Sequence, residues 1–121
     1  MTSERFRRLA LSLPETVEGS HMGHPDFRTA GKIFATLRHP PEGWAMVKLT
    51  PEEQAAVIAA HPDVFEPASG AWGRGGSTMV RLEHAPDDVV RKALVSAHAG
   101  VIPARRRASA SAATPRRRRG G

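Results

Sequence analysis

The last nineteen residues of the chain, 103–121, cannot contribute to a hydrophobic core. Apart from prolines they contain no apolar residue larger than alanine, and they carry seven arginines with no acidic residue: Arg105, Arg106, Arg107, Arg116, Arg117, Arg118 and Arg119. This composition is typical of segments that stay disordered when free. We therefore expect one folded domain over residues 1–102, followed by a disordered Arg-rich tail over residues 103–121.

The positive charge of the chain is concentrated in this tail. Residues 1–102 carry eleven Lys or Arg and twelve Asp or Glu, a net charge of −1, whereas the whole chain has a net charge of +6. Arginine forks suit phosphate groups and displace their counterions, so the tail predicts binding to DNA or another polyanion. Because the tail has no Asn, Gln or aromatic side chain to contact a base, we expect little sequence specificity.

Composition also excludes several classes of protein. The absence of cysteine excludes disulfides, thiolate metal sites and thiol nucleophiles. No stretch is long and apolar enough to span a membrane, and the N-terminus lacks the pattern of a signal peptide. We therefore expect a cytoplasmic protein, and the abundance of Ala, Arg, Gly and Pro suggests a bacterial one.

Three segments have the pattern of amphipathic helices. In the first, apolar residues recur at helical spacing, a cap is available from Thr2 or Ser3, and Pro14 ends the run. The second begins at Thr50-Pro51-Glu52-Glu53, which combines an N-cap, a first-turn proline and a capping glutamate, and should extend over about 51–61. The third opens at Pro86-Asp87-Asp88, and we expect Gly100 to end it.

The remaining segments favour strands. Short runs rich in β-favouring residues occupy 26–30, 32–37 and 44–49 within the stretch 17–49, and another occupies 77–82. Ile33, Ala35 and Leu37 are expected to share one face of the sheet. The glycine-rich stretch 62–77 is expected to be a long surface loop with room for a short strand. The order α-β-β-β-β-α-β-α predicts a two-layer α+β domain, with three helices on one face of an antiparallel sheet of about five strands.

Several short blocks of the sequence together resemble the MmcQ/YjbR family of small bacterial proteins. The blocks are His21-x-x-His24-Pro25-Asp26-Phe27, residues 31–36, residues 47–52, His61-Pro62-x-x-Phe65, and Trp72-Gly73 ahead of Val80-Arg81-Leu82. The resemblance covers residues 3–102 and implies an α+β fold like that of type III secretion chaperones. It also implies DNA binding, the property with which the family is commonly labelled.

Sites for catalysis or metals are not indicated. His21 and His24 lie beside Asp26, but alternation along a strand would place the two histidines on opposite faces, and no third ligand follows. A hydrolase using Ser20 or Ser77 would lack the Gly-x-Ser-x-Gly motif. The glycines of 70–76 lack the spacing of phosphate-binding or dinucleotide-binding loops. We expect no catalytic residue, no metal and no cofactor.

Within the folded domain, a basic and aromatic surface is the remaining candidate site. Its members would come from the open face of the sheet and from the loop above it: Arg28, Lys32, Lys48, Trp72 and Arg74. Such a surface could hold phosphate and stack a base. The alternative is that the charged residues merely keep the sheet face solvated while Trp72 caps the core.

The sequence therefore predicts a monomeric, non-enzymatic protein that binds DNA weakly and largely independently of sequence. The alternative is a binding module for a protein or a small ligand, using the sheet face and the 65–76 loop. No membrane partner is expected.

Overall fold

The computed structural model describes residues 1–21, 23–38 and 43–102, and these form an α+β domain. The elements follow in the order α1 (Ser3–Leu11), β1 (Val17–His21), β2 (His24–Thr29), β3 (Lys32–Arg38), β4 (Trp44–Lys48), α2 (Pro51–Ala60), β5 (Phe65–Pro67), α3 (Gly70–Arg74), β6 (Ser77–Arg81), a 3₁₀ turn (Leu82–His84) and α4 (Asp87–Val101). The predicted α+β class is confirmed. Within these residues the sheet has six strands and is accompanied by four α-helices, because β5 and α3 lie in the stretch predicted as a loop.

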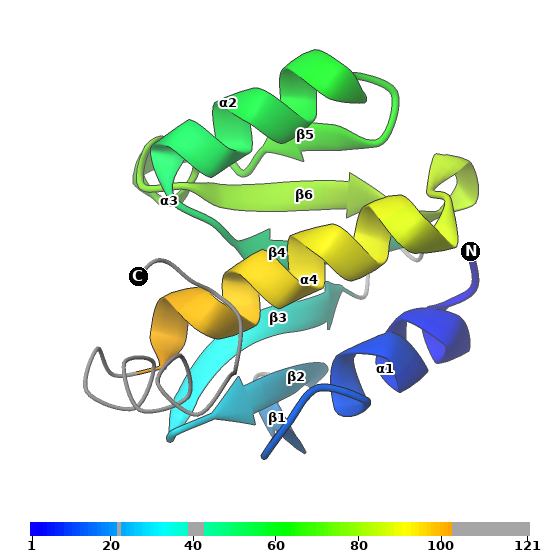
Figure 1. Ribbon diagram of the computed structural model, residues 1–121, viewed down its shortest axis with the longest axis vertical. Coiled ribbons are helices and arrows are strands. Elements are labelled where there is room, and N and C mark those ends of the chain that lie inside the picture. The colour runs from blue at the N-terminus through cyan, green and yellow to red at the C-terminus, as the bar shows by residue number, and fades with distance from the viewer. Residues whose placement is uncertain (22, 39–42, 103–121) are drawn as a thin grey trace, which may run out of the picture.

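The sheet is antiparallel throughout, in the order β1-β2-β3-β4-β6-β5. α4 contacts β3 and β4, α1 contacts β3 and α4, and α2 contacts β5 and β6. Figure 1 shows these three helices in front of the same face of the sheet. Buried apolar side chains from the helices and from this face form the core, including Phe6 of α1, Phe27 of β2, Val47 of β4 and Leu94 of α4. These three helices do not cover the opposite face of the sheet, which is therefore available for a binding site.

A β-bulge in β3 decides which side chains reach the core. Phe27 of β2 pairs with Ala35, whereas the next residue, Arg28, pairs with Ile33, so Phe34 is the extra residue on β3. Phe34 is fully buried and makes an edge contact with His98 of α4, with ring centroids 5.2 Å apart. Ile33 is therefore opposite Arg28 and outside the core cluster, and the expectation that it shares a face with Ala35 was wrong.

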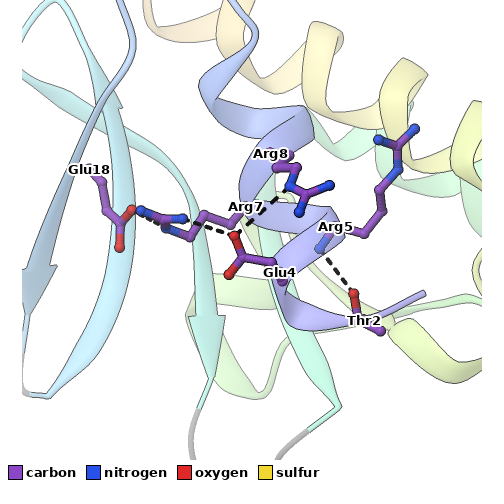
Figure 2. Close-up of polar contacts among 6 residues, drawn as sticks. All are labelled: Thr2, Glu4, Arg5, Arg7, Arg8 and Glu18. Carbon is purple, nitrogen blue, oxygen red and sulfur yellow. Dashed lines mark hydrogen bonds and ion pairs between the residues drawn. The ribbon is translucent and has the colours of Figure 1, made fainter.

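The helix termini follow the sequence closely. Thr2 caps α1 by accepting a hydrogen bond from the Arg5 amide (Figure 2), and α1 ends before Pro14. At α2 the Thr50 hydroxyl accepts from the Glu53 amide while the Glu53 carboxylate accepts from the Thr50 amide, which is the predicted capping box.

The third predicted helix, α4, is the longest in the described part of the chain. It has fifteen residues and runs one residue beyond Gly100, so this glycine lies in the last turn and does not end the helix. No helix among the described residues is both long and apolar enough to cross a membrane.

Ion pairs attach α1 to its neighbours. Figure 2 shows Arg7 reaching both Glu18 of β1 and Glu4 within α1. Hydrogen bonding to Glu18, followed by the attraction of its charge, raises the pKa of Arg7. Arg5 pairs with Asp87 of α4 at 2.7 Å. These arginines are thus engaged by carboxylates of the domain itself, which makes α1 a poor candidate for an anion-binding surface.

Candidate functional site

The face of the sheet away from the helices carries a cluster of aromatic and methionine side chains. Side chains alternate along a strand, so the residues between the core-facing Ala45, Val47 and Val80 point the other way. The pairs Trp44 with Arg81 and Met46 with Met79 join β4 and β6 on this second face. Met46 is buried, while Trp44 and Met79 are partly exposed.

A pocket of about 400 Å³ opens on this face near the β5 edge of the sheet. It is lined by Trp44, Glu66, Pro67, Ala68, Ser69, Trp72 and Met79. Trp72 is 66% exposed, so it does not cap the core, contrary to the alternative considered from sequence. The volume lies within the range of pockets that bind small molecules or single chemical groups of a larger ligand.

Two glycines fix the position of α3 and hence of Trp72. A Cβ atom on Gly73 would lie 1.8 Å from the Ala68 carbonyl oxygen, and one on Gly76 would lie 1.9 Å from that of Leu49. Gly76 also has a φ of +113°, which side-chain-bearing residues rarely adopt. Close backbone packing thus explains why residues 73 and 76 are glycines.

Hydrogen bonds from the side chain of Gln54 in α2 also hold α3 in place. Its amide nitrogen donates to the carbonyl oxygens of Gly73 and Ser77, each at 2.9 Å. These two acceptors lie on either side of the turn between α3 and β6. Gln54 therefore couples the position of Trp72 to that of α2.

Arg81 contacts both an aromatic residue and the acidic residue of the pocket lining. Its guanidinium carbon lies 4.4 Å from the centroid of the Trp44 ring, which is a cation–π contact. One of its nitrogens also lies 3.4 Å from Oε1 of Glu66. The positive charge of Arg81 thus faces both an aromatic wall and the carboxylate of the pocket.

Arg28, a predicted site residue, is engaged elsewhere on the sheet. It donates to the two carboxylate oxygens of Asp26 at 2.7 and 3.1 Å, and Asp26 is fully buried. This hydrogen bonding, followed by Coulomb attraction to Asp26, raises the pKa of Arg28. Arg28 lies on β2, which β3 separates from the strands that line the pocket.

The other predicted residues are distributed over the domain. Lys32 is exposed where the β2–β3 hairpin turns, opposite Thr29. Lys48 is exposed at the end of β4 remote from Trp44, and Arg74 is exposed in the last turn of α3. Of the five residues predicted in the domain, only Trp72 lines the pocket. The seven arginines predicted in residues 103–121 lie outside the described residues.

Sequence reasoning missed Trp44, Glu66, Met79 and Arg81 as site residues. Each lies in a segment predicted as a strand or a loop, and no local pattern distinguishes it from its neighbours. The signal that brings them together is the pairing of β6 between β4 and β5, which joins segments that are distant in the sequence.

The two histidines of the first hairpin are arranged differently from the sequence prediction. His21 and His24 are register partners across β1 and β2, so the two residues lie on neighbouring strands and not on the single strand that the prediction assumed. Across the described ranges, no group of three His, Cys, Asp or Glu residues is arranged to hold a metal ion.

Comparisons with known proteins identify the family. The chain matches the family model YjbR over residues 11–100. A similar fold occurs in the crystal structure of the Deinococcus radiodurans protein DR2400, of family-model domain DUF419, with a TM-score of 0.71 and 16% sequence identity. That match covers 91% of this chain and 88% of the other, and at such identity it shows the fold alone. No curated protein matches the chain. The resemblance derived from the sequence blocks is confirmed, and the chain belongs to the YjbR family.

Proposed function

We propose that this protein binds single-stranded DNA weakly and with little dependence on sequence, and that it has no enzymatic activity. The observation that carries the proposal is the pocket on the uncovered sheet face, where Trp44 and Trp72 both contribute to the lining. Tryptophan rings stack on bases of any sequence, and stacking requires a base that is free of its duplex partner.

The charge around the pocket is compatible with a strand of nucleic acid. Arg81 lies against Trp44, and Arg74 is exposed on the same short helix as Trp72. A base held at the tryptophans would bring its phosphates within reach of such side chains. Because Arg28 is committed to Asp26, we assign it no phosphate contact.

The Arg-rich tail supplies the larger electrostatic contribution in this proposal. Its seven arginines contrast with the net charge of −1 carried by residues 1–102. Binding by such a segment is non-specific and falls steeply as salt is added, since it is driven by counterion release. The tail would concentrate the protein on nucleic acid, and the pocket would distinguish single strands from duplexes.

The absence of an enzymatic activity is part of the proposal. Among the residues that line the pocket, Glu66 is the single ionisable side chain, and the lining offers no base paired with a nucleophile. A lone, half-exposed carboxylate next to an arginine is better suited to accepting hydrogen bonds than to acid–base chemistry.

The second candidate function is a binding module for a protein or a small ligand at the same pocket. It is favoured by the apolar part of the lining, which includes Met79, Pro67 and Ala68, because tryptophan and methionine are enriched at protein interfaces. In that case DNA would contact the tail alone.

Intrinsic fluorescence separates the two candidates. The chain contains two tryptophans, and both line the pocket, so tryptophan emission reports directly on its occupancy. Titration of the full chain with single-stranded DNA should change the emission, whereas a duplex of the same length should bind through the tail and leave it nearly unchanged. Equal responses to both ligands, or none, would remove the support for nucleic acid in the pocket.

A further inference from the structure

The polar chemistry of the pocket constrains the kind of group that it can hold. Glu66 contributes a carboxylate whose side chain is 54% exposed, and Arg81 contacts it through one oxygen, Oε1. A carboxylate oxygen has more than one acceptor site, so this contact leaves capacity for hydrogen bonds from a ligand. The pocket therefore combines aromatic walls with an acceptor group.

A positively charged ligand is a poor occupant of the pocket, because the guanidinium of Arg81 is already there. Two tryptophans and a carboxylate would otherwise suit a quaternary ammonium or a methylated lysine. However, Arg81 already lies over Trp44 and already pairs with Glu66. A cation in the pocket would meet the like charge of Arg81 at short range, which is unfavourable. A neutral, flat ring that donates hydrogen bonds avoids this repulsion.

Guanine is the nucleobase that matches such an acceptor. Its N1–H and its 2-amino group are adjacent donors on one edge, and a carboxylate can accept from both at once. Adenine, cytosine and thymine each place an acceptor next to the donor on the corresponding edge, so a carboxylate would face one of their lone pairs. As a purine, guanine also has a larger face than a pyrimidine for stacking on tryptophan.

We propose that the pocket selects a guanine base, with Glu66 accepting from its N1–H and 2-amino groups and the exposed ring of Trp72 stacking on it. This inference rests on the proposed function and deepens it, because it names the base that one pocket prefers while the rest of the strand is bound without regard to sequence. Arg81 is a positioning residue here, since its contact with Oε1 orients the carboxylate.

The test uses the full chain and single-stranded thymidine oligonucleotides that differ in one central base. The strand with a central guanine should bind about tenfold more tightly than the strand with adenine, as expected for a two-donor contact. A central deoxyinosine, which keeps N1–H and lacks the 2-amino group, should bind with intermediate affinity. This series changes only the ligand, so it does not depend on whether any variant folds.

Two variants locate the contact. Glu66→Gln should reduce the ratio of guanine to adenine affinities towards one, because an amide cannot accept from two donors in the same way as a carboxylate. Glu83→Gln is the matched control, since Glu83 is an exposed carboxylate outside the pocket lining, and the ratio should be unchanged. A guanine preference that is absent, or that persists in Glu66→Gln, would overturn the inference.

Titration with free guanosine monophosphate tests whether the pocket binds a free nucleotide or only a guanine within a strand. A fluorescence change with this nucleotide that Glu66→Gln abolishes would support the guanine contact and identify free nucleotides as ligands. A preference seen only with oligonucleotides would support the same contact within a strand. Tight binding of tetramethylammonium or a trimethyllysine peptide at the tryptophans would overturn the inference in favour of a cation pocket.

Failure of the inference is distinguishable from failure of the proposed function. If Trp72→Ala weakens binding to every single strand equally and the wild-type chain shows no guanine preference, the proposed function stands and the guanine contact is wrong. If Trp72→Ala leaves all single-strand affinities unchanged, the proposed function itself fails.

Discussion

Asp26 and Arg28, two residues apart on β2, form a two-point ion pair in which the carboxylate is fully buried and the guanidinium is partly exposed. The pair lies on the same face of the sheet as the pocket but near the other edge, because β2 is next to the edge strand β1 whereas the pocket is near β5. Gly19 of β1 packs closely against this ion pair. A Cβ atom at position 19 would lie 3.1 Å from Oδ1 of Asp26. An arginine that appears in the sequence to be available for phosphate is thus a structural residue.

Arg28→Ala should lower the midpoint of thermal unfolding clearly, since it leaves the buried carboxylate of Asp26 without its partner. Arg28→Lys should recover only part of the loss, because lysine cannot reproduce a two-point contact. Arg91→Ala, which removes an exposed arginine of α4, is the control. If the Arg28 and Arg91 variants were equally stable, the ion pair would have no structural role.

Thr50→Ala should cost about 1 kcal/mol in the free energy of unfolding, because it removes the side-chain acceptor of the Glu53 amide at the start of α2. Thr50→Ser keeps the hydroxyl and should retain most of the stability. Chemical denaturation of the three proteins measures the difference. An unchanged midpoint in the alanine variant would mean that water replaces the cap.

Gly73→Ala should destabilise the protein by about 1 to 3 kcal/mol, since its methyl group would overlap the carbonyl of Ala68 and force α3 to move. Gly75→Ala is the matched control two residues away, where the new methyl group would meet only ordinary contacts at 3.6 Å. The displaced α3 should also alter tryptophan emission through Trp72. Similar behaviour of the two variants would contradict the packing explanation of this glycine-rich stretch.

Removal of residues 103–121 should leave the midpoint of unfolding unchanged while it sharply reduces affinity for DNA. The tail has no side chains with which to build a core, so the domain should not depend on it. If all seven arginines engage phosphates, the full chain should show a slope of log K against log salt of roughly −6, and the truncated chain a much smaller one. A marked loss of stability on truncation would show that the tail packs against the domain.

The local features of the fold could be predicted from the sequence because their causes are local. The capping box at Thr50, the apolar periodicity of α1 and the turn-delimited strands all depend on neighbouring residues. The short strand for which the 62–77 loop had room is β5, but its three residues are too few to show alternation and so to fix its bounds. α3 was not predicted because it begins and ends among glycines.

The site was harder to predict because its geometry depends on long-range pairing. Trp72 could be predicted as a candidate site residue from its type and its position in a loop, and it lines the pocket. Its partner Trp44 could be found only once the register of β4 against β6 was known, since that register brings Trp44 and Met79 to one side of the sheet. The contact of Arg28 with Asp26 could not be predicted because it depends on which side chains share a face.

The most direct test of the proposed function compares Trp72→Ala with the unaltered full chain on single-stranded and duplex DNA of the same length at one salt concentration. Stacking of one base predicts that the variant loses roughly 5- to 150-fold in affinity for the single strand, because such a contact contributes about 1 to 3 kcal/mol. Affinity for the duplex and the salt dependence of binding should not change. An equal loss on both ligands, or no loss on the single strand, would contradict a base-stacking pocket on the sheet face.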